Sequence, residues 1–119
     1  MTTATTPRLT PREAFAALGF TLTEQPREER RDAFGRPVVT RWCRITPAAC
    51  SRIGATGEGP DDATAEERLD NDLRATLRGL LAYAEADALA AVASPRRGHA
   101  GAAAAASWRN RVRAIVGAL

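Results

Sequence analysis

Residues 64–93, TAEERLDNDLRATLRGLLAYAEADALAAVA, form the longest stretch of the chain with a single hydrophobic period. The apolar residues recur at steps of three and four, at Leu69, Leu73, Leu77, Leu80, Ala84, Ala88 and Ala91. This spacing places them on one side of an α-helix. Ser94-Pro95 ends the pattern, because the residue before a proline is pushed out of the helical region. We therefore expect one long amphipathic helix over Thr64–Ala93.

The start of this helix carries its own signals. Thr64 and Glu67 have the spacing of a capping box, in which each side chain bonds to the backbone N–H of the other. Acidic residues crowd the first turns, where the helix dipole favours negative charge. The buried side changes from leucine at the start to alanine at the end. Because alanine buries little apolar area, we expect the second half to need a tightly packed neighbour.

The segments before this helix predict a small helix-hairpin-helix unit over residues 10–54, after a polar tail over residues 1–9. Thr10-Pro11-Arg12-Glu13 is a second capping box with proline at the first helical position, and Gly19 suits the turn that ends this helix. Phe20–Thr46 reads as a β-hairpin with its turn at Asp32–Gly35. Its first arm, with Pro26 and a charged run, suits only an exposed edge. Thr46-Pro47 then predicts a brief helix ending at Gly54.

Residues 55–63 read as a linker, and residues 64–119 as a helical hairpin. An alanine run follows the loop at Pro95–His99, and Ser107–Leu119 is a second amphipathic helix. Its apolar face holds Trp108, Val112, Ile115, Val116 and Leu119. The sequence therefore predicts a single small α+β domain, in which a short helix and a β-hairpin precede two long helices. At 119 residues the chain is too short for two domains.

Charge is divided unevenly along the chain. Residues 1–54 hold nine arginines against five acids, residues 55–93 hold three against nine, and residues 94–119 hold five arginines and no acid. Two readings stay open: the acidic helix pairs with the basic C-terminal segment within one chain, or the charges steer assembly with another molecule. All seventeen basic residues are arginine, as expected of a GC-rich genome such as that of an actinobacterium or its phage.

The residues that could carry catalysis are sparse, so we expect no enzyme, no cofactor and no metal site. His99 is the only histidine and lies in an Arg/Gly loop without an orienting partner. Cys43 and Cys50 have no histidine nearby in sequence to form a thiolate, and we expect free thiols. The glycines at 54–59 lack the spacing of a phosphate-binding loop. No secretory signal or membrane span is recognisable, which predicts a cytoplasmic protein, or a virion protein if phage-encoded.

Nucleic-acid binding is the alternative function, because the isoelectric point is about 9.6 and arginine is dense in the hairpin. The candidate contacts, here called the hairpin set, are Arg27, Arg30, Arg31, Arg36, Arg41, Trp42 and Arg44. LTPREAFAALG (residues 9–19) resembles the first helix of excisionase-type winged-helix proteins, and RWCRITPAACSRI (residues 41–53) resembles their wing strand and the helix after it. The resemblance implies a recognition helix within residues 21–31, which Pro26 would interrupt.

The preferred hypothesis is a non-enzymatic interaction or assembly protein, such as a virion or connector component of a phage or a regulator of a host protein. Segregated charge, the alanine half of the long helix and two amphipathic helices in a short chain favour it. We expect a homo-oligomer or a larger assembly. The candidate interaction residues, here called the C-terminal set, are Arg96, Arg97, Trp108, Arg109, Arg111 and Arg113.

Overall fold

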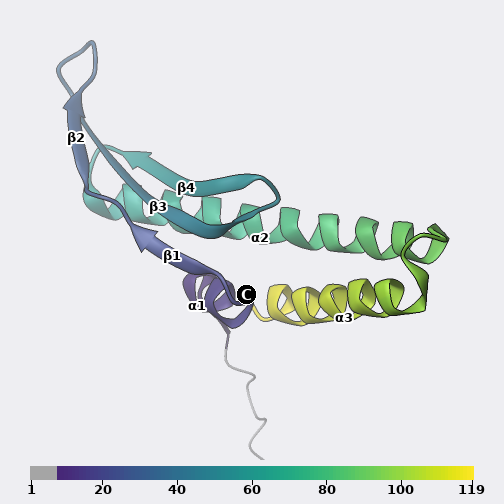
Figure 1. Cartoon of the computed structure of the whole chain (residues 1–119). Coiled ribbons are helices and arrows are strands. Elements are labelled where there is room, and N and C mark those ends of the chain that lie inside the picture. Colours follow the sequence, from purple (N-terminus) through teal and green to yellow (C-terminus); the bar gives the residue numbers. More distant parts are fainter. Residues whose placement is uncertain (1–7) are drawn as a thin grey trace, which may run out of the picture.

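The structure is a computed structural model that describes residues 8–119. Its elements are α1 (Pro11–Ala17), β1 (Thr21–Glu24), β2 (Glu28–Arg31), β3 (Pro37–Ala49), β4 (Arg52–Gly59), α2 (Asp62–Ala93) and α3 (Gly98–Gly117). The sheet lies on one side of α2, while α1 and α3 lie on the other (Figure 1). The predicted α+β class is therefore confirmed. The first seven residues of the predicted polar tail lie outside the described residues.

The first helix forms as its sequence predicts. The Glu13 N–H donates to Thr10 Oγ1 at 3.1 Å, and the Thr10 N–H donates to Glu13 Oε1 at 3.0 Å. Pro11 occupies the first turn, where a helix has no use for its missing N–H. Gly19 follows the helix with a φ of 88°, which is the left-handed conformation expected at this position.

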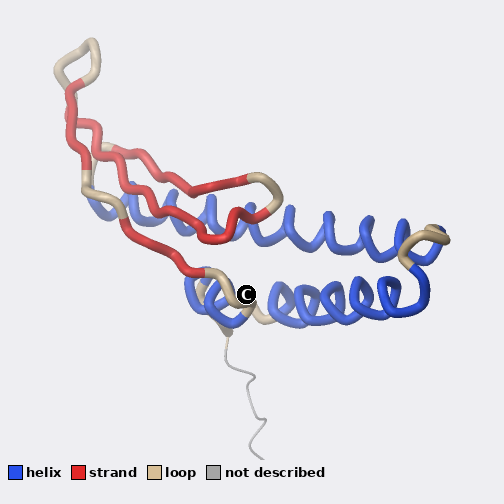
Figure 2. Tube along the Cα trace, in the orientation of Figure 1, coloured by secondary structure: helices blue, strands red, loops and turns tan. Residues whose placement is uncertain are grey.

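Strand β3 is the centre of a four-stranded antiparallel sheet (Figure 2). β1 and β2 pair one after the other with the same edge of β3, and β4 pairs with its opposite edge. The predicted turn is confirmed, since Asp32 accepts from the Gly35 N–H at 3.0 Å and Gly35 has a φ of 76°. All four residues of β2 are exposed, as expected for its charged sequence at an edge.

The predicted short helix after Thr46 and the predicted linker are both wrong. β3 continues to Ala49, the chain turns at Cys50 and Ser51, and β4 runs from Arg52 to Gly59. The reason is a period of two, because Cys43, Ile45 and Ala49 are buried on the same side of β3. Pro47 falls in the irregular stretch between Arg44 and Ala49, where the ladder is interrupted and the missing N–H is tolerated.

The two helices implied by the resemblance to excisionase-type proteins are also absent from the described residues. Thr21–Glu24 and Glu28–Arg31 are strands, and residues 41–53 lie within the β3–β4 hairpin. The resemblance was therefore wrong as a description of the fold. Its first element, the helix at residues 11–17, does form.

Strand β4 lies unusually close to α2, because glycine occupies its inward positions. A Cβ built on Gly57 would overlap the Ala65 carbonyl oxygen and the Leu69 amide nitrogen, and one built on Gly59 would lie 2.7 Å from Thr64 Cγ2. In sequence these glycines indicate a flexible linker. In the fold they let the backbones of a strand and a helix touch.

Helix α2 begins earlier than predicted, because Asp61 rather than Thr64 caps it. Asp61 Oδ1 accepts from the Thr64 N–H at 2.7 Å, so the helix starts at Asp62. It ends at Ala93, as expected from Ser94-Pro95. The predicted apolar side, here called the core stripe, is buried throughout: Leu69, Leu73, Leu77, Leu80, Ala84, Ala88 and Ala91.

Helix α3 is one continuous helix that includes both the alanine run and the predicted amphipathic segment. It packs antiparallel beside α2, with Val112 buried and Trp108 and Ile115 packed against the core. The Leu9 N–H donates to the Ala118 carbonyl oxygen at 2.7 Å, which ties the end of this helix to the chain just before α1. None of the described helices combines the length and the apolar composition needed to cross a membrane.

Candidate interaction surfaces

The acidic start of α2 is joined to the N-terminal half of the chain by a network of ion pairs. Arg12 contacts Glu24 and Glu66, each at 2.8 Å. Arg41 lies 3.6 Å from both of these carboxylates. Arg27 donates its Nε to Asp62 at 2.6 Å. The network thus links α1, β1, β3 and the first turns of α2.

The electrostatics of this network are cooperative but modest. Partial burial lowers the pKa of Arg12, yet the hydrogen bond and charge of Glu66 and the charge of Glu24 outweigh it, so the pKa is raised overall. Each partly exposed pair contributes on the order of 0–1 kcal/mol. The more important consequence is that Asp62 and Glu66 are already partly neutralised by arginines of the same chain.

The C-terminal set is only partly neutralised by α2. Arg97 pairs with Asp87 at 2.9 Å, and Arg113 pairs with Glu85 at 3.4 Å. Arg111 instead donates to the Ala17 carbonyl oxygen at 2.8 Å and lies over the Trp108 ring. Among residues 8–119, the side chain of Arg109 bonds only to the neighbouring Asn110. Most of the acids of α2 therefore pair within the chain, chiefly with arginines that precede the helix in sequence.

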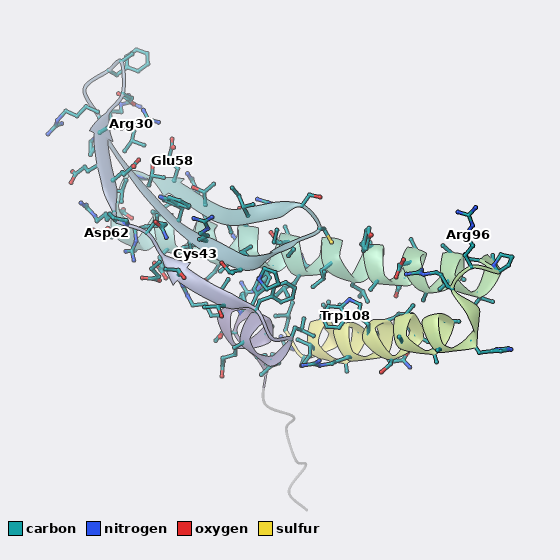
Figure 3. All side chains as sticks on the ribbon, in the orientation of Figure 1. Arg30, Cys43, Glu58, Asp62, Arg96 and Trp108 are labelled. Carbon is teal, nitrogen blue, oxygen red and sulfur yellow. The ribbon has the colours of Figure 1, made fainter. Side chains whose placement is uncertain are left out.

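The positions of the C-terminal set differ along α3. Trp108 lies at the inner end of the α2–α3 pair, near Phe20, whereas Arg96 lies at its free end (Figure 3). Arg96 is exposed. The six residues therefore do not form one patch, and they divide between the root and the tip of the helical pair.

The hairpin set lies on the strands but is split between the two faces of the sheet. Arg41 turns inward to the ion-pair network, while Trp42 and Arg44 alternate with Cys43 on the outer face. Arg27 and Arg30 are held by carboxylates, the latter by Glu58 at 3.0 Å. The remaining members lie near the hairpin tip, where Arg31 bonds to the Gly35 carbonyl oxygen and Arg36 lies over the exposed Phe34 ring.

The two thiols, Cys43 and Cys50, lie in surroundings that do not favour the thiolate form. Cys43 is fully buried in the core, and burial raises the pKa of its thiol. Cys50 is a free, exposed thiol at the β3–β4 turn, and partial burial raises its pKa as well. A raised pKa disfavours the thiolate that nucleophilic chemistry needs. Within residues 8–119, no three His, Cys, Asp or Glu side chains are grouped for metal binding.

The C-terminal turns of α2 and the facing part of α3 form a two-helix arm, residues 85–107, that extends beyond the sheet (Figure 1). The β3–β4 turn reaches only to Gly79, whose carbonyl oxygen lies 3.9 Å from Cys50 Sγ. Leu80 and Ala84 still belong to the main core, and beyond them the buried side chains between the two helices are Ala88, Ala91 and Ala105, with Ala102 against them. The core of the arm therefore consists of methyl groups alone.

The arm also exposes larger apolar side chains. Leu89 is 73% exposed and Val92 is 77% exposed. With steps of three and four residues, they continue a second line along α2, here called the outer stripe: Arg74, Arg78, Leu81, Glu85, Leu89 and Val92. The sequence reasoning missed this line because the leucines of the core stripe dominate the same period. Its signal is that Leu81, Leu89 and Val92 lie outside that stripe.

An apolar pocket of about 550 Å³ lies at the root of the arm, between the β3–β4 turn, α2 and α3. It is lined by Leu18, Gly19, Phe20, Pro47, Ala48, Cys50, Ser51, Leu80, Tyr83 and Trp108. A pocket of this size and character can hold an apolar side chain or a small ligand. Tyr83 is largely exposed at its edge, which extends the apolar surface from the pocket onto the arm.

Comparison with known proteins gives no match: no family model fits the chain, and no curated protein sequence or solved structure resembles it significantly.

Proposed function

We propose that this chain is a non-enzymatic assembly protein that associates with other protein subunits through its helical arm. The observation that carries this proposal is the combination of an all-alanine core inside the arm with exposed Leu89 and Val92 on its surface. Large apolar side chains in a repeated line are typical of helices that pack against a partner.

The arm should gain stability from a partner, because it buries little apolar surface of its own. Each buried methyl group contributes about 0.8 kcal/mol, so three buried alanines supply only a small part of the cost of ordering two helices. Covering Leu89 and Val92 would add about 1.5–3 kcal/mol for each side chain. A partner on this surface would therefore stabilise the arm more than its own core does.

The test is the oligomeric state of the purified full chain, measured by native mass spectrometry and light scattering. We expect an oligomer, and we expect Leu89→Asp combined with Val92→Asp to weaken or abolish it while the circular dichroism spectrum stays that of a folded chain. The melting temperature should fall only as far as the loss of the partner's contribution requires. Ile53→Asp is the matched control, because Ile53 is also exposed but lies on the sheet. A chain that stays monomeric at high concentration and retains no protein from a cell lysate would refute the proposal.

The second candidate function is DNA binding by the β2–β3 hairpin. It is favoured by the tip, where Phe34 is 83% exposed beside Arg36, since aromatic and arginine side chains together suit contact with bases and phosphates. This candidate predicts a retarded band in a gel-shift titration at low salt, which disappears steeply as salt rises. Arg36→Ala should weaken the band, whereas Arg74→Ala on α2 should not. No retarded band at low salt would exclude it.

A further inference from the structure

The outer stripe lies on the side of α2 that faces away from the sheet. Asp72 marks the sheet side, because its carboxylate accepts from the Thr56 N–H of β4 at 2.9 Å and pairs with Arg52. Arg74 follows Asp72 by two residues, which is about 200° around a helix. The strands therefore do not cover the outer stripe, which starts at Arg74. Helix α3 borders it, since Leu81 is partly buried against the core, and the exposed part of the stripe consists of Arg78, Leu89 and Val92, with Ala82 beside them.

The charges on this stripe are not balanced within the chain. Arg78 is exposed and has no ion-pair or hydrogen-bond partner among residues 8–119. Glu85 has one partner, Arg113 of α3, at 3.4 Å, so the carboxylate retains capacity for a second guanidinium. Between them, Ala82 is exposed and small, which would allow another helix to approach closely at this point.

The charged residues of the stripe are spaced so that two antiparallel copies of it would place opposite charges face to face. Arg78 lies three residues before Leu81, and Glu85 lies three residues after Ala82. A two-fold axis between Leu81 and Ala82 would therefore place each Arg78 opposite the Glu85 of the other helix. Arg74 lies seven residues before Leu81, and Leu89 lies seven residues after Ala82. The same axis would therefore place Arg74 of one copy against Leu89 of the other, where the aliphatic part of the arginine can cover the leucine.

We propose that a second copy of this chain is the partner of the outer stripe, with the two α2 helices packed antiparallel about a two-fold axis between Leu81 and Ala82. This inference rests on the proposed assembly function and specifies its partner. The pairing is isologous, because the same patch serves both copies. Two reciprocal Arg78–Glu85 contacts, each joined by Arg113, would flank the apolar centre.

The charge pattern also selects the direction of pairing. In a parallel arrangement, Arg78 would face Arg78 and Glu85 would face Glu85, and like charges opposite one another are repulsive. Only the antiparallel arrangement converts both positions into attractive pairs. Charge reversal therefore distinguishes the two directions. In the antiparallel dimer Arg78→Glu turns an attractive pair into a repulsive one, whereas in a parallel dimer it leaves like charges facing one another as before.

The experiment is analytical ultracentrifugation of the full chain with four variants. Arg78→Glu and Glu85→Arg should each weaken self-association by about tenfold or more, because two attractive contacts per dimer become repulsive. The double variant should associate more tightly than either single variant but less tightly than wild type, because Glu85→Arg also sets a guanidinium beside Arg113. An equimolar mixture of the two single variants should associate more tightly than either alone. Arg44→Glu and Glu28→Arg, at exposed sheet positions, are the matched controls and should change nothing.

The outcomes separate this inference from the proposed function. If the chain is oligomeric and both single reversals associate like wild type, the α2 pairing is overturned while assembly through another surface stands. If the single variants weaken association but neither the double variant nor the mixture restores it, the reciprocal contact is overturned. A chain that is monomeric and binds no protein refutes both. Circular dichroism of each variant establishes that the fold is retained.

Discussion

The closest contact in the fold is between β4 and α2 at Gly57, and a single methyl group there should be strongly destabilising. A Cβ at this position would lie 2.8 Å from Leu69 Cα and closer still to the Ala65 and Leu69 backbones, whereas carbon atoms prefer about 3.5–4.0 Å. The added Cβ is fixed to the backbone of β4, and the atoms that it would overlap belong to the backbone of α2. No side-chain rotation can therefore relieve the overlap. Gly57→Ala must therefore move the strand away from the helix.

The size of the effect follows from the cost of overpacking, which is about 1–3 kcal/mol. Because neither backbone can yield locally, we expect the upper end, about 3 kcal/mol. For 119 residues, the entropy of unfolding is about 0.25 kcal/mol/K. The melting temperature should then fall by about 12 °C. Thermal and urea unfolding followed by circular dichroism measure both quantities.

Gly79→Ala is the matched control, because it makes the same chemical change at an exposed position of α2 with nothing within 4 Å of the new Cβ. There the alanine should stabilise the helix by about 0.5–1 kcal/mol. Since both variants lose the same glycine freedom in the unfolded chain, their difference isolates the contact with α2. A Gly57→Ala protein as stable as wild type would refute the close packing of β4 on α2.

Four further predictions follow from the fold. Leu73 is fully buried on the core stripe, so Leu73→Asp should leave the chain unfolded by circular dichroism, and an unchanged melting temperature would mean that the buried face is misassigned. Arg109→Ala combined with Arg113→Ala should change the free energy of unfolding, measured in urea, by no more than about 1 kcal/mol. The same double variant should bind any acidic partner more weakly. The hydrogen bond from the Thr64 N–H lowers the pKa of Asp61, so its cap stabilises α2 above the ordinary pKa of about 3.9 and is lost as pH falls through the folded pKa. Asp61→Ala should therefore lower the melting temperature at pH 7, and the difference from wild type should shrink as pH falls through the folded pKa. In native protein, maleimide should label Cys50 and spare Cys43 until denaturant is added, and Cys50→Ser should abolish native labelling.

Much of the helical part of this fold was predictable, because its signals are local. The Thr10–Glu13 capping box, Ser94-Pro95 and the core stripe act within one or two turns of the helix they define. The start of α2 was misplaced by two residues, since Asp61 and Thr64 both suit a cap and the side chain of Asp61 is the one that accepts from a first-turn N–H.

Strand β4 was not predictable from its own residues. The sequence RIGATGEG is poor in the branched and aromatic residues that indicate strands. It is held by pairing with β3 and by the approach of α2, which are both long-range contacts. The same limit applies to the candidate interaction surfaces, because exposure of Leu89 and Val92 depends on where α3 lies, and periodicity alone does not give that position.

The contact between residues 9 and 118 has a consequence for synthesis of the chain. Phe20 and α1 pack on α2 and β1, and they receive a further part of their cover from α3, through the Trp108 ring, the Arg111 side chain and the Leu9–Ala118 hydrogen bond. Because α3 follows α1 in the chain, this part of the cover is added only after α3 has been synthesised. During translation this side of the sheet and of α2 stays open to water and to other chains. The N-terminal elements of this fold are therefore fully covered only when α3 is present.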